Sequence, residues 1–425
     1  MGLFSGKKLL VLGSNIASVD IVEYAKSEGA YVIVTDYLPK EKSQAKMHAD
    51  KDYMISTVDI DKLTELIKEE NIDGVFCGVS EVNLQSVQKV TEIVGLPCYF
   101  TKEQWNLCEN KANFKELCFK YGVPTAKQYC ISNDNLLESV KKIEYPVIVK
   151  PVDLCASRGI HICYNETELL EGYIDSYNKS PSNSVIVEQY LYGDEISATY
   201  DFVNGECRLS LFSQMYYNTE QTGLVPLPDA YIYPSKHLTK FIETVNNSMI
   251  KMLKSLDLKN GTVFVTGIAN ENGFSFFEAG LRIAGTAPYR FLSELNGINT
   301  MKLMTEYALN GEIANRDILK LEDPYMKGKH CCLFSLLNKG GIIAEISGVD
   351  KAADLPGVIS YTIQRGVGDE IKNDGTLGQV NIRFYIVKDT IEEIRETIVM
   401  IQKIVNVKDS FGQGMLLKSN VVNVL

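Results

Sequence analysis

YPVIVKPVDLCASRGI (residues 145–160) is an apolar run that ends in a lysine and is followed by a loop of small residues. The run predicts a buried strand, which Pro151 stops, because a short apolar stretch bounded by a turn signal is typical of one. Lys150 ends this strand, where its compact ammonium group could reach the phosphates of a nucleotide. A lysine whose charged head simply extends into water is the ordinary alternative.

The loop that follows the strand contains Ser157, Arg158 and Gly159. Small residues allow backbone N–H groups to approach an anion closely, so the loop could contact a triphosphate. Arg158 would add a further phosphate contact. Without other evidence, a plain hairpin turn explains the same residues.

Three more charged residues lie at the ends of predicted elements on either side of this strand. Lys111 begins a predicted helix, and Glu188 ends the apolar run VIVEQYL. Glu278 lies on the apolar strand of SFFEAGLRIAG (275–285), where a lone acid is costly unless a cation meets it. Arg282 follows four residues later. The alternatives are a surface position for Glu188 and a structural ion pair between Glu278 and Arg282.

Residues 8–100 alternate short apolar runs with helical patterns. This order predicts a parallel, doubly wound sheet, in which ligands bind beyond the carboxyl ends of the strands. Residues 13–15, Asp36 and residues 80–81 stand at those ends. A dinucleotide site would also use Asp36, but GSNIAS lacks two glycines of the usual turn, which disfavours an NAD-dependent enzyme.

Bulk composition excludes some classes of function. The 425-residue chain has a formal net charge of −11, which argues against general affinity for nucleic acid or anionic membranes. Its 10 cysteines follow no metal-binding spacing, so we expect reduced thiols in a cytoplasmic protein. No apolar stretch is long enough to span a membrane. From about residue 326, strands and Gly-rich turns predominate.

The motifs, in this order, resemble the ATP-grasp family of carboxylate–amine ligases. The stretches that carry the resemblance are ENKANFKELCFKYGVPTA (109–126), YPVIVKPVDLCASRGI (145–160), VIVEQYLYGDEIS (185–197) and FFEAGLRIAG (276–285). The resemblance implies an α/β fold with ATP-grasp architecture. Its expected parts are an N-terminal doubly wound parallel-sheet domain (1–105), a two-lobed nucleotide clamp (106–325, with a lid at about 126–190) and a C-terminal β-rich α+β subdomain (326–425).

The resemblance also implies roles for individual residues. Lys111, Lys150 and the loop residues Ser157, Arg158 and Gly159 would bind the phosphates of ATP. Glu188 would accept from the adenine amino group, with the backbone near Tyr190 and Leu191 completing its recognition, and Glu195 would hold the ribose. Glu278 would bind Mg²⁺, and Arg282 would act on the transferred phosphoryl group.

The chain departs from the family pattern at the metal site. Many members have an asparagine ligand where this sequence has Gly280, and an acid or amide on the preceding strand where it has Thr266. Glu278 is therefore the one clear metal carboxylate, although Mg²⁺ prefers several oxygen ligands.

These features support an enzyme in which ATP phosphorylates a small carboxylate and an amine then attacks the acyl phosphate. An amino acid ligase is the favoured member, whereas purine-pathway or carbamoyl-phosphate-like roles are alternatives. Gly280 and Thr266 motivate a second hypothesis, in which the protein binds a nucleotide but has impaired catalysis and acts as a sensor or partner subunit. A homodimer is compatible with either.

Overall fold

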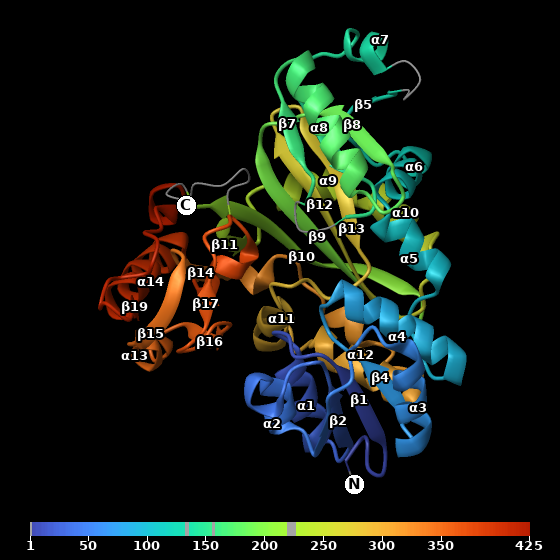
Figure 1. Ribbon diagram of the computed structural model, residues 1–425, viewed down its shortest axis with the longest axis vertical. Helices are drawn as coiled ribbons and strands as arrows, with labels where there is room; N and C mark the ends of the chain where they lie inside the picture. Colours follow the sequence, from blue (N-terminus) through green and yellow to red (C-terminus); the bar gives the residue numbers. More distant parts are fainter. Residues whose placement is uncertain (1, 132–135, 155–157, 219–226) are drawn as a thin grey trace.

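The computed structural model describes residues 2–131, 136–154, 158–218 and 227–425. It has three regions, with the N-terminal domain at the bottom of Figure 1, a small lobe at the top and the C-terminal strands at the left. Tyr145–Pro146 and Tyr233–Pro234 are cis peptide bonds.

The N-terminal domain is built on a parallel sheet of order β3-β2-β1-β4. Its strands and helices are β1 (Lys8–Leu12), α1 (Ser18–Ser27), β2 (Tyr31–Thr35), α2 (Gln44–His48), β3 (Lys51–Tyr53), α3 (Ile60–Glu70), β4 (Gly74–Phe76) and α4 (Glu81–Val94). The aliphatic residues that predicted strands, 9–12 in β1 and 32–34 in β2, are fully buried. Residue 81 begins α4 at the carboxyl end of β4, as the doubly wound prediction required.

The small lobe has its own sheet and its own core. Strands β5 (Gln128–Tyr129), β6 (Val147–Pro151), β7 (His161–Cys163) and β8 (Val185–Gln189) form a sheet of order β5-β8-β6-β7, with helices α7 (Leu136–Val140) and α8 (Glu166–Lys179). Its apolar side chains, among them Val147, Val149 and Leu169, form a cluster separate from the main core. A lobe with a separate core can move as a unit, which is what a lid requires.

The main body contains an eight-stranded sheet of order β13-β12-β9-β10-β11-β14-β18-β16. Its elements up to residue 310 are α5 (Lys102–Glu109), α6 (Lys111–Tyr121), β9 (Asp194–Val203), β10 (Glu206–Tyr217), β11 (Pro228–Tyr233), α9 (Leu238–Thr244), α10 (Asn246–Lys254), β12 (Gly261–Asn270), β13 (Gly273–Gly280), α11 (Tyr289–Leu295) and α12 (Thr300–Asn310). The β9–β10 hairpin turns at Asn204 and Gly205, both with positive φ, as its Asn-Gly sequence predicts.

The C-terminal region comprises β14 (His330–Leu337), β15 (Gly341–Ser347), α13 (Val349–Ala353), β16 (Val358–Ile363), β17 (Glu370–Ile371), β18 (Val380–Lys388), α14 (Ile391–Ile404) and β19 (Asn406–Asp409). Of these strands, β14, β16 and β18 extend the large sheet, whereas β15, β17 and β19 form a small sheet of order β17-β15-β19. β14 pairs with β11, so the large sheet is continuous across residue 326. A second core between the sheet and α14 includes Phe334, Phe384 and Ile398.

None of the helices in the described part of the chain combines the length and the apolar character needed to cross a lipid bilayer.

Candidate nucleotide and substrate site

A buried ionic cluster joins the lid to the main body. Lys150 at the end of β6 places its Nζ 2.6 Å from Oε2 of Glu188 on the neighbouring strand β8. Lys115 on α6 donates to the other oxygen, Glu188 Oε1. Glu188 is only 2% exposed, and Lys150 4%. Lys150 Nζ also lies 5.1 Å from the ring centroid of Phe277 on β13, so the cluster spans both lobes.

The two lysines decide the charge state of Glu188. Burial by itself would raise the pKa of this carboxyl, but the positive charges of Lys150 and Lys115 outweigh burial and hold the pKa below its usual value. Burial also lowers the pKa of Lys115, and Glu188 opposes that effect. Each carboxylate oxygen has a second lone pair, so Glu188 can still accept from an adenine amino group. That predicted contact stays a prediction.

Lys111 and Glu278 form a second, looser pair. Lys111 is the first residue of α6, because Asn110 caps that helix with bonds from Ala112 and Asn113. Its Nζ lies 3.6 Å from Glu278 Oε1 and donates to the carbonyl of Leu154 at 2.7 Å. The Glu278 carboxylate, which lies on an apolar strand, therefore faces an ammonium group. The Glu278 side chain is also 38% exposed.

Arg282 pairs with a carboxylate of the N-terminal domain, and its predicted contact with a phosphoryl group stays a prediction. Its Nε lies 3.0 Å and its terminal nitrogen 2.5 Å from Oε1 of Glu81, which begins α4 of the N-terminal domain. The guanidinium carbon also lies 4.9 Å from the ring centroid of Phe264. Glu278 and Arg282 thus have separate ion-pair partners, so they are not a structural pair with each other. A role for Arg282 on a phosphoryl group would require the Glu81 pair to open.

Glu109, a half-buried acid at the end of α5, lies beside Arg282. It accepts from the backbone N–H of Leu281 at 2.8 Å. Burial, and to a lesser degree the charge of Glu81, raises the pKa of Glu109 to about 8, although Arg282 opposes this. A carboxyl group with a pKa near neutrality can exchange a proton at working pH, so Glu109 is a candidate for that role.

The predicted adenine and ribose residues lie on one edge of the lid and on β9. The Tyr190 backbone N–H is already used in a bond to Pro146 at 3.0 Å, which leaves its carbonyl for a ligand. Glu195 accepts from the hydroxyl of Tyr217, and burial raises the pKa of Glu195. Leu191 is partly buried next to them. The structure brings these residues to one side of the site, and their contacts with a nucleotide remain predictions.

The small-residue loop is described in part. Gly159 has φ of +71°, and a Cβ there would lie 3.0 Å from Cγ of Pro151, so glycine is favoured on both counts. Its carbonyl accepts from Ser176 at 2.6 Å. Arg158 lies next to it. Ser157 falls outside the described residues, and the phosphate contacts predicted for the loop remain predictions.

Thr266 and Gly280, the two positions at which the sequence departs from the usual metal ligands of the ATP-grasp family, lie beside Glu278 in the structure. Thr266 pairs directly with Glu278 across β12 and β13, so it occupies the place of the missing acid. A Cβ at Gly280 would lie 2.3 Å from Cζ of Phe264, which explains the glycine by the aromatic ring that covers it. Over the four described ranges, no three acidic, His or Cys side chains gather to hold a metal.

Sequence reasoning missed Lys115 and Glu109. Lys115 follows Lys111 by one helical turn, and that spacing was a signal for a second ammonium on the same face. The sequence placed Glu81 at a strand end where ligands bind, but nothing in it linked Glu81 or Glu109 to Arg282, because they meet Arg282 only through tertiary contacts between different regions of the chain.

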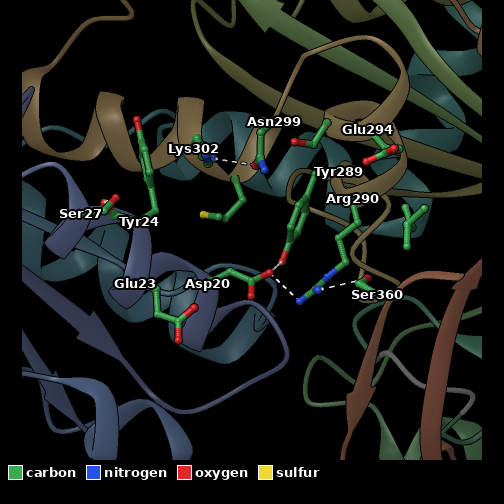
Figure 2. A pocket seen from close by; sticks show the side chains of 13 residues that line it. Asp20, Glu23, Tyr24, Ser27, Tyr289, Arg290, Glu294, Asn299, Lys302 and Ser360 are labelled. Atoms are coloured by element: carbon green, nitrogen blue, oxygen red, sulfur yellow. Dashed lines mark hydrogen bonds and ion pairs between the residues drawn. The ribbon is translucent and has the colours of Figure 1, made fainter. Parts of the chain in front are cut away.

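A separate cleft of about 440 Å³ lies between α1, α11, α12 and β16. Figure 2 shows Tyr289 and Arg290 converging on Asp20, with both bonds at 2.6 Å. Arg290 also lies 3.4 Å from the hydroxyl of Ser360. These contacts join the N-terminal domain, the main body and the C-terminal strands.

Comparison with known proteins identifies the fold. A family model described as the phosphoribosylglycinamide synthetase ATP-grasp (A) domain matches residues 109–219. The carbamoyl phosphate synthase large chain of Clostridium beijerinckii is 25% identical over 327 residues, which are 73% of this chain and 30% of that protein. The chain therefore spans less than a third of the curated relatives that it matches.

Two solved structures resemble nearly the whole chain. The L-amino acid ligase of Bacillus licheniformis has a TM-score of 0.77 at 16% identity, covering 96% of this chain and 99% of that one. The biotin carboxylase domain of Hydrogenobacter thermophilus 2-oxoglutarate carboxylase, solved with MgADP, ADP and bicarbonate, has a TM-score of 0.77 at 17% identity, covering 96% and 91%. Both structures share the fold of this chain, so the predicted ATP-grasp fold is confirmed.

Proposed function

We propose that this ATP-grasp protein is an ADP-forming ligase that joins a small carboxylate to an amine through an acyl phosphate. The observation that carries the proposal is the cluster of three lysines, Lys111, Lys115 and Lys150, where the lid meets the main sheet. Buried ammonium groups are suited to a polyphosphate, and on this fold the nucleotide would lie between the lid and the main sheet. An amino acid is the favoured carboxylate substrate.

The residues present fit ATP and Mg²⁺, in part. Lys111 and Lys150 would bind phosphate oxygens, and Glu278 would provide one hard oxygen ligand for Mg²⁺. When bound, the ion would neutralise charge on the phosphates. Glu278 now faces Lys111, so this ion pair would have to open for Glu278 to hold Mg²⁺ and for Lys111 to bind a phosphate oxygen. Closure of the lid would exclude water, which an acyl phosphate requires.

A second candidate is a nucleotide-binding sensor or partner subunit without ligase chemistry. Thr266 and Gly280 favour it, because Glu278 alone supplies a metal carboxylate on these two strands. ADP release measured against pools of carboxylates and amines separates the candidates. An enzyme releases ADP only when both substrates are present, whereas a sensor binds ATP without such dependence. Cytoplasmic location and a homodimer remain predictions, the latter checked by light scattering.

Glu278→Gln is expected to abolish the Mg²⁺-dependent tightening of ATP binding and to leave the apo protein nearly as stable as the wild type. The reason is that the Lys111–Glu278 contact is long and the acid partly exposed, so that its loss should cost about 0–1 kcal/mol. Calorimetric titration of ATP with and without Mg²⁺, together with apo thermal melting, measures both effects. Glu271→Gln, at the exposed tip of the same hairpin, is the matched control. A large loss of apo stability with unchanged Mg·ATP affinity would show that Glu278 is structural.

A further inference from the structure

Two carboxyl groups meet inside the protein away from the nucleotide site. Asp201 lies on β9 near the hairpin turn and is 1% exposed. Glu322 follows a short 3₁₀ helix, Ile318–Leu321, in the segment that connects α12 to β14. Both of its carboxylate oxygens are buried, and burial together with the nearby charge of Asp201 raises its pKa well above the usual carboxyl value. The contact joins residues 311–329 to the main sheet.

Hydroxyl groups surround the pair. Thr300, the first residue of α12, donates to Asp201 Oδ2 at 3.0 Å. Thr262 stands directly opposite Asp201 on β12. Ser210 lies where the register of β10 shifts against β9, and bulges of this kind re-aim a side chain. It is 0% exposed, and its hydroxyl faces both carboxyl groups closely enough to lower the pKa of each.

Four buried atoms in this cluster lack a hydrogen-bond partner among the described residues. They are Asp201 Oδ1, Ser210 Oγ and both carboxylate oxygens of Glu322. Leaving a buried polar atom unpaired is unfavourable, so four together demand an explanation. Three of the four are oxygens that can only accept while both acids are ionised. The cluster is therefore short of a donor.

No cation in the described residues forms an ion pair with either acid. The charge of Arg208 on β10 lowers the pKa of Glu322 without an ion pair between them. The carboxylate that pairs with Arg208 is Glu206, at 3.9 Å. The Cys207 thiol also lies near Asp201. Burial raises the pKa of this thiol to about 12, so the thiol stays uncharged. β12 and α12 contribute hydroxyls rather than charges. Burial raises the pKa of both acids, Glu322 more strongly.

We propose that Asp201 and Glu322 share one proton, which latches residues 311–329 onto the sheet. Glu322 takes the proton from water and donates its O–H to Asp201 Oδ1. Ser210 donates its O–H to the remaining Glu322 oxygen. One added proton thus satisfies all four unpaired atoms and removes the repulsion between two buried charges. The latch does not depend on the proposed ligase function.

The sign of the pH dependence follows from the raised pKa values. The stabilisation is fully present below the ordinary carboxyl pKa, where folded and unfolded chains are both protonated. It is lost as the pH rises toward the raised folded-state pKa, because the folded protein must then give up its proton or keep it at increasing cost. The latch therefore holds at acidic pH and weakens at alkaline pH.

Glu322→Gln tests the proposal, because its amide can donate to Asp201 and accept from Ser210 at any pH. Between pH 5.5 and 8.5, we expect the unfolding equilibrium constant of the wild type to increase with pH more steeply than that of the variant. The ratio of the two constants should rise by up to a factor of ten per pH unit. Asp229 and Glu109 also have raised pKa values, about 6 and about 8, but they titrate in both proteins and cancel. Asp317→Asn, an exposed acid on the same segment, should keep the wild-type profile.

A direct measurement of the proton accompanies the stability profile. The infrared spectrum at pH 7 should contain a carboxylic-acid C=O band that Glu322→Gln removes and Asp317→Asn retains. Parallel pH profiles with no band removed would overturn the proposal. So would a wild-type melting temperature that rises with added Ca²⁺ or K⁺ and falls with a chelator, since a cation would then occupy the proton's place. If Glu322→Gln did not fold, Asp201→Asn supplies the same comparison.

Discussion

Glu188→Ala should lower the free energy of unfolding by about 3–5 kcal/mol, because it leaves the ammonium groups of Lys115 and Lys150 buried without their shared anion. Denaturant titration measures the loss, and faster amide hydrogen exchange over residues 128–189 would locate it in the lid. The folded-state pKa of Glu188 is depressed, so its contribution is present above the ordinary carboxyl pKa of 4.5 and lost as the pH falls through the lower folded value. The difference between wild type and variant should therefore shrink in acid.

Glu144→Ala is the matched control for this prediction. Glu144 also belongs to the lid and also pairs with a lysine, Lys127 at 2.8 Å, but its side chain is 74% exposed. Removing such a surface pair should change stability by no more than about 1 kcal/mol. Equal stability of Glu188→Ala and the control, with lid protection unchanged, would contradict a buried role for Glu188.

Gly280→Asn is expected to destabilise the protein by about 1–3 kcal/mol and to lower ATP turnover. The substitution restores the asparagine ligand that many ATP-grasp members have, so an impaired metal site would predict a gain instead. The structure predicts a loss, because the new Cβ would lie 2.3 Å and 2.4 Å from two atoms of the Phe264 ring. That ring also faces the guanidinium group of Arg282, so its displacement would disturb the site. Thermal melting and steady-state ADP release measure the two effects.

Gly285→Ala is the control for a glycine substitution near the same loop, since a Cβ there meets nothing within 4 Å. The double variant Gly280→Asn, Phe264→Ala removes the obstructing ring and should recover part of the lost stability. If Gly280→Asn alone were as stable as the wild type and turned over ATP faster, the ring would be an incidental neighbour. That result would favour a nucleotide-binding sensor over a ligase, because it would show that the wild-type metal site limits catalysis.

The sequence by itself determined the elements and their order. Apolar runs such as KLLVL (8–12) and VIVKP (147–151) predicted buried strands, Asn204–Gly205 predicted a hairpin, and the structure has them at those places. These are local signals, because hydrophobic periodicity and turn conformations depend on neighbouring residues. The spacing of Lys111, Lys150, Glu188 and Glu278 then indicated the ATP-grasp family, and the comparisons confirm that fold.

Only the tertiary structure decided which charges meet. The sequence suggested Glu188 for an adenine and Arg282 for a phosphoryl group, but each already has a partner from another region, Lys115 and Glu81 respectively. Arg282 and Glu81 are 201 positions apart, and Asp201 and Glu322 likewise come from distant segments. A buried charge is paired according to distance and desolvation in the folded state, and neither quantity is encoded in local spacing. For the same reason, the sequence could not explain the glycine at position 280, because the Phe264 ring that covers it is brought there by the fold.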